Sequence, residues 1–184
     1  VTNIGSSAFS QCPLLTAAVL GNSVVSIGPG AFNGCVSLTN IVIPGSVLQL
    51  GGASFGSCSN LTGAFFKGDA PDYINTPFPL ASNTVTAYYL PGTSGWGPTY
   101  GGKPTALWNP EMETSDGVFG IGPSGFGFVV NGTTNIPIAV EASERLNAET
   151  WMALYTGKLT NGSVYFSDPA WTNYATRYYR IRSP

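Results

Sequence analysis

The sequence predicts a mainly β protein in which a solenoid of short parallel strands and short helical turns is followed by a small antiparallel β-sandwich. Two observations lead to this fold class. A 23-residue period runs through the first half of the chain, as the spacing of Phe9, Phe32 and Phe55 shows. Short apolar runs separated by Gly, Asn and Ser then fill residues 118–184, a pattern typical of short antiparallel strands.

Each copy of the repeat holds the same residue types in the same places. A period of about 20–29 residues with a Leu-x-x-Leu-x-Leu core is typical of a leucine-rich repeat solenoid, and the second core here is Leu38-x-x-Ile41-x-Ile43. One coil alone cannot bury its apolar face, so neighbouring coils must stack. A degenerate fourth copy keeps its Phe, as Phe78, and is expected to cap the stack. Further matched sets are Cys12, Cys35 and Cys58, and Leu15, Leu38 and Leu61.

The residues of one coil divide between an apolar interior and an outer face. Because side chains alternate along a strand, Ile41 and Ile43 point inward while Asn40 and Val42 point outward. The Ala-Phe pair is expected on a short helical turn opposite the strand, where Phe32 fills the space between coils. The Gly-rich segments supply the corners.

The repeat resembles a known family, the bacterial BspA-like leucine-rich repeats. Their pattern I-x-x-x-A-F-x-x-C-x-x-L-x-x-I-x-I-P is followed closely over residues 1–91, although the fourth copy lacks the Cys and the Ala before Phe. The following segment, residues 88–110, looks like the one that commonly closes such arrays. The resemblance implies a secreted or cell-surface protein that binds proteins, matrix or other cells, and it implies no enzyme.

A change of composition predicts a second domain. We expect the solenoid with its capping segment over residues 1–108, a solvated acidic linker over 109–117, and the β-sandwich over 118–184. Asn131-Gly132 and Asn161-Gly162 predict hairpin turns between strands of the sandwich. The expected strands are Phe126–Val130, Ile136–Ala142, Trp151–Tyr155, Ser163–Phe166 and Arg177–Ile181.

The amino-acid composition excludes several classes of function. Charged residues make up 9% of the chain, the net charge is −2 and no charge precedes Lys67, so no basic footprint for nucleic acid or anionic membrane exists. No apolar run is long enough to insert into a membrane. With no His, a Ser-His-Asp or Cys-His arrangement is excluded. The closely spaced acids, such as Asp69 and Asp72, are interpreted as turn and linker residues. The alternative is a carboxylate pair of a carbohydrate-active enzyme, as in glycoside hydrolysis.

Two motifs resemble functional sites and are interpreted as structural. The three cysteines could pair or bind a metal, but their odd number leaves one unpaired and no His completes a zinc site. We expect buried thiols that behave as small hydrophobes. Residues 120–125 match G-x-G-x-x-G, yet a strand follows them, so a glycine turn is expected in place of a nucleotide loop. No catalytic, cofactor or metal site is predicted.

The outward strand positions are the predicted binding face. An apolar stripe exposed in a row often marks a binding surface, and here it would hold a protein or an extracellular matrix or cell-surface ligand. The alternative is that the second domain or an adjoining subunit covers the stripe. The candidate residues are Val19, Asn40, Val42, Phe65, Thr86 and Tyr88.

The start of the chain suggests a second function class. Val1 begins in the middle of a repeat, so the first coil is expected to leave an open edge at Val1, Ile4 and Phe9. Another subunit could stack there, and head-to-tail contacts that do not close produce filaments. The alternative function is therefore a structural subunit of an extracellular filament or surface layer, a homopolymer.

Two further expectations concern the cell surface. A start at Val rather than Met favours a processed or trimmed start of the chain. The triplets at Asn60, Asn131 and Asn161 match the N-glycosylation pattern, although such triplets also arise by chance in an Asn- and Thr-rich chain.

Overall fold

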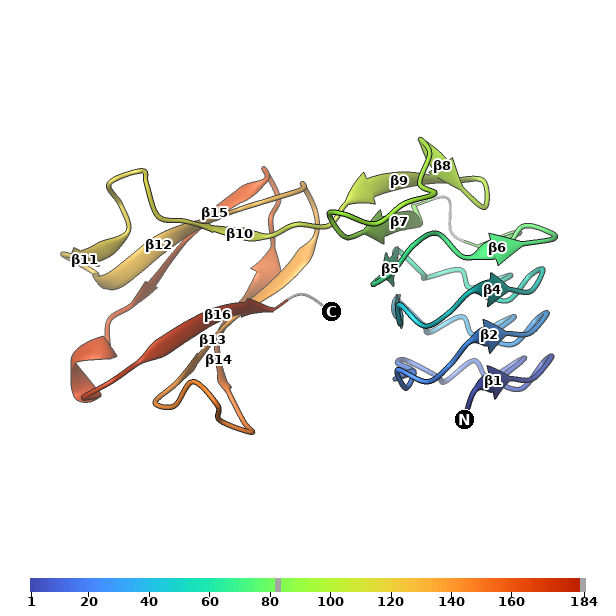
Figure 1. The fold of residues 1–184 in the computed structure, drawn as a ribbon, viewed down its shortest axis with the longest axis horizontal. Helices are drawn as coiled ribbons and strands as arrows, with labels where there is room; N and C mark the ends of the chain where they lie inside the picture. Colours follow the sequence, from blue (N-terminus) through green and yellow to red (C-terminus); the bar gives the residue numbers. More distant parts are fainter. Residues whose placement is uncertain (82–83, 183–184) are drawn as a thin grey trace. The chain divides into compact units, whose positions relative to one another are not determined.

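The fold was obtained as a computed structural model that describes residues 1–81 and 84–182. The chain divides into two compact units, Val1–Leu107 and Trp108–Pro184, and each is described by itself. The first unit is a solenoid of stacked coils, and the second consists of antiparallel strands (Figure 1).

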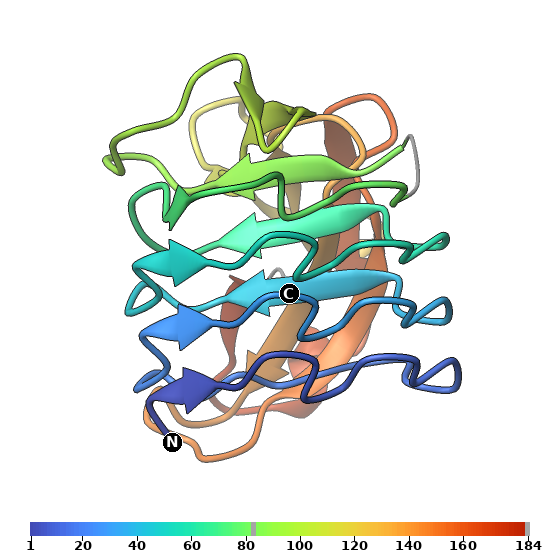
Figure 2. The same ribbon diagram turned by 90° about the vertical axis from the view of Figure 1, so that its right-hand side faces the viewer.

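Two ladders of parallel strands run along the solenoid. The broader ladder contains β3 (Asn40–Ile43), β5 (Gly63–Phe66), β7 (Thr86–Tyr89) and β9 (Lys103–Leu107), with β8 (Thr99–Tyr100) antiparallel to β9. The narrower ladder contains β1 (Asn3–Ile4), β2 (Ser26–Ile27), β4 (Gln49–Leu50) and β6 (Asp72–Tyr73). Figure 2 shows these short strands stacked one above the other.

The register of the ladders equals the sequence period. Asn40 pairs with Gly63 and Gly63 with Thr86, each 23 positions further on, which confirms the predicted solenoid. One predicted strand is missing, since residues 17–20 of the first coil form none.

Stacked phenylalanines form the centre of the solenoid core. The rings of Phe9, Phe32, Phe55 and Phe78 follow one another at centroid distances of 5.1, 5.4 and 5.7 Å with nearly parallel planes. Phe32 and Phe55 are fully buried. Since each ring touches the ring of the next coil, the Phe positions fill the space between coils as the repeat predicted.

The Ala-Phe segments are turns, and the prediction of short helical turns there is wrong. Gly30 and Gly34 have left-handed φ angles of 62° and 76°, and the matching positions Ser7, Gln11 and Ala53 have 57°, 58° and 55°. A right-handed helix cannot continue through left-handed residues. The backbone therefore makes isolated turns between them.

The backbone hydrogen bonds between coils point in opposite directions on two sides of the solenoid. On the turn side, the N–H groups of Ser7 and Phe9 donate to carbonyls of the next coil, with the Phe9 bond to Ala31 at 2.7 Å. Beside the narrow ladder, the N–H groups of Gly28 and Gly51 donate to the preceding coil, at 2.8 and 2.7 Å. The second and third coils are thus each held by donors that face both of their neighbours.

The cysteines line the interior as reduced thiols. The thiol of Cys35 donates to the carbonyl of Phe9 at 3.2 Å, and that of Cys58 donates to the carbonyl of Phe32 at 3.1 Å. Both side chains are fully buried, whereas Cys12 is half-buried. Burial raises the pKa of Cys58 to about 11. The interpretation of Cys35 and Cys58 as buried structural thiols is confirmed.

Thiol labelling of the native protein is expected to proceed in two phases. Cys12 should react first, because it is half-buried whereas Cys35 and Cys58 are fully buried. Cys35 and Cys58 should react only when the solenoid opens, and therefore at a rate that rises with urea. Mass spectrometry of a time course measures this. Equal rates for the three cysteines in the absence of urea would contradict the expectation.

Ser54 is expected to weaken the solenoid. Its hydroxyl is fully buried and has no hydrogen-bond partner among the described residues, and the equivalent positions are Ala8 and Ala31. A buried hydroxyl without a partner costs about 1–3 kcal/mol, so Ser54→Ala should raise the free energy of unfolding by about 1 kcal/mol. Urea unfolding of both proteins measures the change. A loss of stability in Ser54→Ala would show that this hydroxyl has a partner.

Aromatic residues close the solenoid beyond the fourth coil. The ring of Trp96 stacks on Tyr89 with centroids 5.2 Å apart, and Tyr100 meets Phe66 edge-on at 5.2 Å. The hydroxyl of Tyr100 donates to the carbonyl of Pro71 at 2.8 Å. The segment that joins β7 to β9 thus covers the last apolar surface of the stack.

The second unit contains two antiparallel sheets. One is built on β12 (Gly125–Asn131), which pairs with β10 (Glu111–Glu113), β11 (Gly120–Gly122) and β15 (Ser163–Asp168). In the other, β13 (Pro137–Ser143) lies between β14 (Met152–Lys158) and β16 (Tyr178–Arg182), and a 3-10 turn, η1 (Trp171–Asn173), precedes β16. Aromatic contacts join the sheets, such as Phe126 stacked on Tyr179 at 4.9 Å. This agrees with the predicted sandwich.

Three local predictions in this unit have different outcomes. Residues 111–113, expected in a linker, form β10 and pair with β12. Asn131-Gly132 and Asn161-Gly162 are not hairpin turns, because they lead from β12 to β13 and from β14 to β15, which belong to different sheets. The glycine turn at residues 120–125 is confirmed, since Gly122 pairs with Gly125 in the β11–β12 hairpin.

Two buried carboxylates organise the charged groups of the second unit. Asp168 accepts hydrogen bonds from Arg177 at 2.6 Å and from the hydroxyl of Tyr179 at 3.0 Å. Glu141 accepts from Arg180 and Arg182 at 2.8 and 2.9 Å. Burial alone would raise the pKa of Glu141, but these hydrogen bonds outweigh it and hold that pKa below its usual value. The ionised Glu141 therefore stabilises the second unit at neutral pH, and this stabilisation is lost as the pH falls through the lowered pKa of Glu141.

Candidate interaction surfaces

The predicted binding face lies partly on the broad ladder. Asn40 and Val42 on β3 and Thr86 on β7 are half-buried outward positions. Val19 is 99% exposed, but it belongs to the first-coil segment that forms no strand. These residues therefore share an outer face without forming one uniform stripe.

Two of the predicted face residues are buried, and the expectation that they are exposed is wrong. Phe65 is 0% exposed and Tyr88 is 7% exposed, and their rings stack at 4.8 Å. A Cβ on Gly63 would lie 2.6 Å from Cε2 of Phe65. Because Gly63 has no side chain, the Phe65 ring can lie down on its own strand. Whether the face binds a partner stays a prediction.

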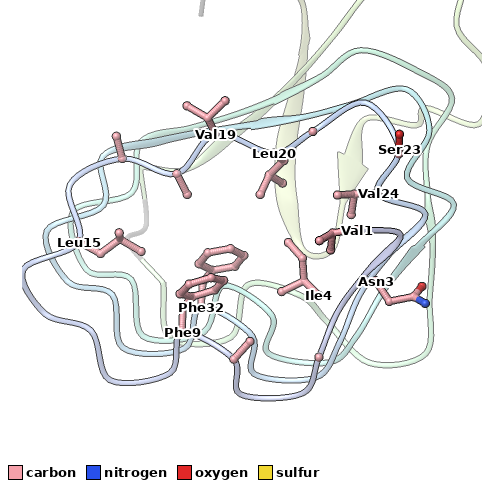
Figure 3. A pocket seen from close by; sticks show the side chains of 15 residues that line it. Val1, Asn3, Ile4, Phe9, Leu15, Val19, Leu20, Ser23, Val24 and Phe32 are labelled. Atoms are coloured by element: carbon pink, nitrogen blue, oxygen red, sulfur yellow. The ribbon is translucent and has the colours of Figure 1, made fainter.

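The first coil leaves an apolar pocket of about 740 Å³ at the end of the solenoid. Figure 3 shows Ile4, Phe9 and Leu15 pointing into the ring of the coil, while Val19 points away from it. Val1 is 93% exposed and Phe9, the first ring of the phenylalanine stack, is 44% exposed. The surface thus has the apolar character of the contacts between coils, and its role in assembly stays a prediction.

Sequence reasoning missed a polar row on the narrow ladder. Its outward side chains are Asn3, Ser26, Gln49 and Asp72, which the ladder pairs in order. The hydroxyl of Ser26 donates to Oδ1 of Asn3 at 2.7 Å. A signal for this row exists in the sequence, because its members are 23 residues apart and all polar. We call these residues the polar row.

A groove of about 900 Å³ follows the polar row across β2, β4 and β6. Its wall includes Tyr73, which is 42% exposed, and Ile74, which is 96% exposed. Glycines lie along it, and a Cβ on Gly28 would lie 2.7 Å from the backbone nitrogen of Ser6. The missing side chains let adjacent coils approach closely here and leave open space outside them.

The described residues contain neither a metal-binding cluster nor a membrane-spanning helix. Residues 1–81 and 84–182 contain no cluster of three His, Cys, Asp or Glu side chains that could hold a metal ion. Within the same residues, no helix has the length and apolar character needed to cross a membrane.

The possible glycosylation sites differ in structure. The side-chain amide of Asn60 donates to the carbonyl of Val36 at 2.8 Å. Asn131 ends β12 and pairs with both Glu111 and Ser163. Asn161 lies in an exposed turn. Modification at these positions stays a prediction.

The stacked coils, their 23-residue register and their shared phenylalanine core define a leucine-rich repeat solenoid. Residues 1–77 match the family model for the BspA type leucine rich repeat region (6 copies). Comparison with curated proteins found no match, and comparison with solved structures found none. Leucine-rich repeat solenoids of this type are repeat-based scaffolds for protein interaction.

Proposed function

We propose that the chain is a non-enzymatic binding module of a secreted or cell-surface protein, which holds a protein or matrix ligand on the outer face of the broad ladder. The observation that supports this is the row of outward positions on parallel strands, such as Asn40 on β3 and Thr86 on β7, in a fixed register. Stacked coils hold such side chains rigidly, so little conformational freedom is lost when a partner binds.

The composition of the solenoid agrees with a short-range mode of recognition. Before Lys67 the chain has no charged side chain, so long-range electrostatic attraction contributes nothing on the first coils. Contacts would depend on apolar groups such as Val19 and Val42 and on neutral donors and acceptors such as Asn40. Lys67 lines a pocket together with Val19 and Val42, so any dependence of binding on salt should come from that side chain.

Purified full-length protein tested against immobilised fibronectin, fibrinogen, laminin and collagen examines this proposal. Where binding is found, Val19→Asp/Val42→Asp should weaken it by about tenfold or more, because carboxylates would be buried at the contact. Leu14→Asp is the matched control, because Leu14 is an apolar residue outside the predicted binding face and is 88% exposed. This variant should bind normally. Unchanged binding by the double variant would contradict the proposed face.

The alternative function, head-to-tail stacking into a filament, needs two complementary open ends. In the solenoid, Trp96 and Tyr100 pack against the last coils and occupy one end. We therefore do not extend the proposal to a filament. Electron microscopy of the concentrated protein would detect filaments if they form.

A further inference from the structure

We propose that the groove along the polar row binds an extended, neutral β-1,4-linked polysaccharide, laid across the coils of the solenoid. The polar row presents Ser26, Gln49 and Asp72 on three successive coils beside the groove. The amide of Gln49 and the carboxylate of Asp72 form no side-chain hydrogen bond with any residue in the described part of the chain. Both groups are exposed and available to a ligand.

The spacing of the row fits such a polymer. Neighbouring strands lie about 4.8 Å apart, so the polar row offers a hydrogen-bonding side chain at that interval. A flat β-1,4-linked pyranose chain advances by about the same length for each sugar. Successive sugars in such a chain are turned over relative to each other, so alternate sugars present the same edge and can meet every second side chain of the polar row in the same way.

The chemistry of the groove fits a neutral sugar chain. The amide of Gln49 both donates and accepts, and the carboxylate of Asp72 accepts, which matches hydroxyl groups that do both. Among the described residues that line the groove there is no Lys or Arg. An anionic ligand would meet no countercharge there and would be repelled by Asp72.

Tyr73 supplies a fixed aromatic surface at one end of the row. Its hydroxyl oxygen accepts a hydrogen bond from the N–H of Gly101 at 3.2 Å, and its ring meets Tyr100 edge-on at 5.1 Å. These two contacts hold a ring that remains 42% exposed. The apolar face of a pyranose can pack on such a ring without the cost of first ordering it.

An extended peptide fits the same groove less well. A strand advances about 3.3 Å per residue and returns a side chain to the same face only after about 6.6 Å, so its side chains fall out of step with the coils. A peptide that binds by strand addition also needs a free sheet edge, whereas the polar row lies on the face of a ladder.

Isothermal titration of the full chain with cellobiose, cellotetraose and cellohexaose tests the proposal. Affinity should rise by about tenfold or more from the disaccharide to the tetrasaccharide and then level off. The reason is that the polar row has side chains for no more than about four sugars. Maltohexaose, whose α-linked chain is curved, should bind at least about tenfold more weakly than cellohexaose.

Substitutions place the binding in the groove. Gln49→Ala/Asp72→Ala should weaken cellohexaose binding by about tenfold or more, since two exposed hydrogen-bonding groups are lost without removal of core atoms. Ser59→Ala, an exposed position outside the groove, is the control and should bind normally. Circular dichroism verifies that both variants are folded.

Three results would overturn the proposal. They are the absence of heat from every cello-oligosaccharide at millimolar concentration, equal affinity for maltohexaose, and full cellohexaose affinity in Gln49→Ala/Asp72→Ala. If no saccharide binds, a pool of random decapeptides can be tested on the same proteins. Peptides that bind the wild type but not Gln49→Ala/Asp72→Ala would assign the groove to a peptide and would also overturn the proposal.

Discussion

Replacement of Phe55 by alanine is expected to lower the free energy of unfolding of the solenoid by about 3–5 kcal/mol. Its ring is fully buried and stacks on both Phe32 and Phe78. Removal of the ring leaves a cavity between three coils that the rigid backbone ladders cannot close. In a stack stabilised by contacts between neighbours, the loss of a central contact also separates the coils on either side.

Hydrogen exchange measured by mass spectrometry in a urea series reports this loss for the solenoid separately. Phe9→Ala is the matched control, because Phe9 is 44% exposed and stacks on Phe32 alone. It should cost about 1 kcal/mol. Equal losses for Phe9→Ala and Phe55→Ala would contradict the view that the phenylalanine stack holds the coils together.

Removal of the carboxylate of Asp168 is expected to destabilise the second unit by about 3–5 kcal/mol. Asp168 is 4% exposed and the side chain of its ion-pair partner Arg177 is 7% exposed, so Asp168→Ala leaves a buried guanidinium without its carboxylate partner. The hydroxyl of Tyr179 loses its acceptor in the same substitution. Hydrogen exchange of residues 125–131 and 163–168 in urea measures the effect.

Two further variants separate the ion pair from other causes. Asp168→Leu/Arg177→Met removes both charges and should recover much of the lost stability, since the cost arises from the unpaired charge. Glu144→Ala removes an exposed carboxylate and should change stability by less than about 0.5 kcal/mol. A double variant as unstable as Asp168→Ala would show that Asp168 stabilises the unit in another way.

The solenoid could be predicted in detail because each coil repeats the same packing. Phe9, Phe32 and Phe55 occur at equal spacing in the sequence and stack in the structure. The turn conformation could not be predicted, because the left-handed positions hold Ser7, Gln11 and Ala53 as well as glycines. Only in the second copy do Gly30 and Gly34 mark both positions, and one marked copy among three is a weak signal.

The strand pairs of the second unit were harder to predict than its strands. Asn131-Gly132 has the composition of a hairpin turn, but the choice between pairing within a sheet and crossing to the other sheet depends on distant residues. Here Asn131 pairs with Ser163 and not with a residue of β13. The segment 111–113, which holds Glu111 and Glu113, likewise pairs with β12, and local composition does not reveal this pairing.

The candidate surfaces show what alternation along a strand predicts. It correctly separates Ile41, which is buried, from Val42, which is half-buried. It gives the direction of Phe65 but not its burial, since the ring lies over Gly63 and stacks on Tyr88. The polar row could have been found by the period alone, if the positions of Asn3 and Ser26 had been compared across all copies.

The opposed hydrogen bonds of the solenoid have an electrostatic consequence. In an α-helix all peptide dipoles point the same way and give the two ends opposite partial charges. Here the N–H of Phe9 points toward the next coil while the N–H of Gly28 points toward the preceding one, so the two sets of dipoles oppose each other along the stacking axis. Neither end of the stack acquires a charge that side chains would have to neutralise, and the coils before Lys67 can do without acidic or basic residues.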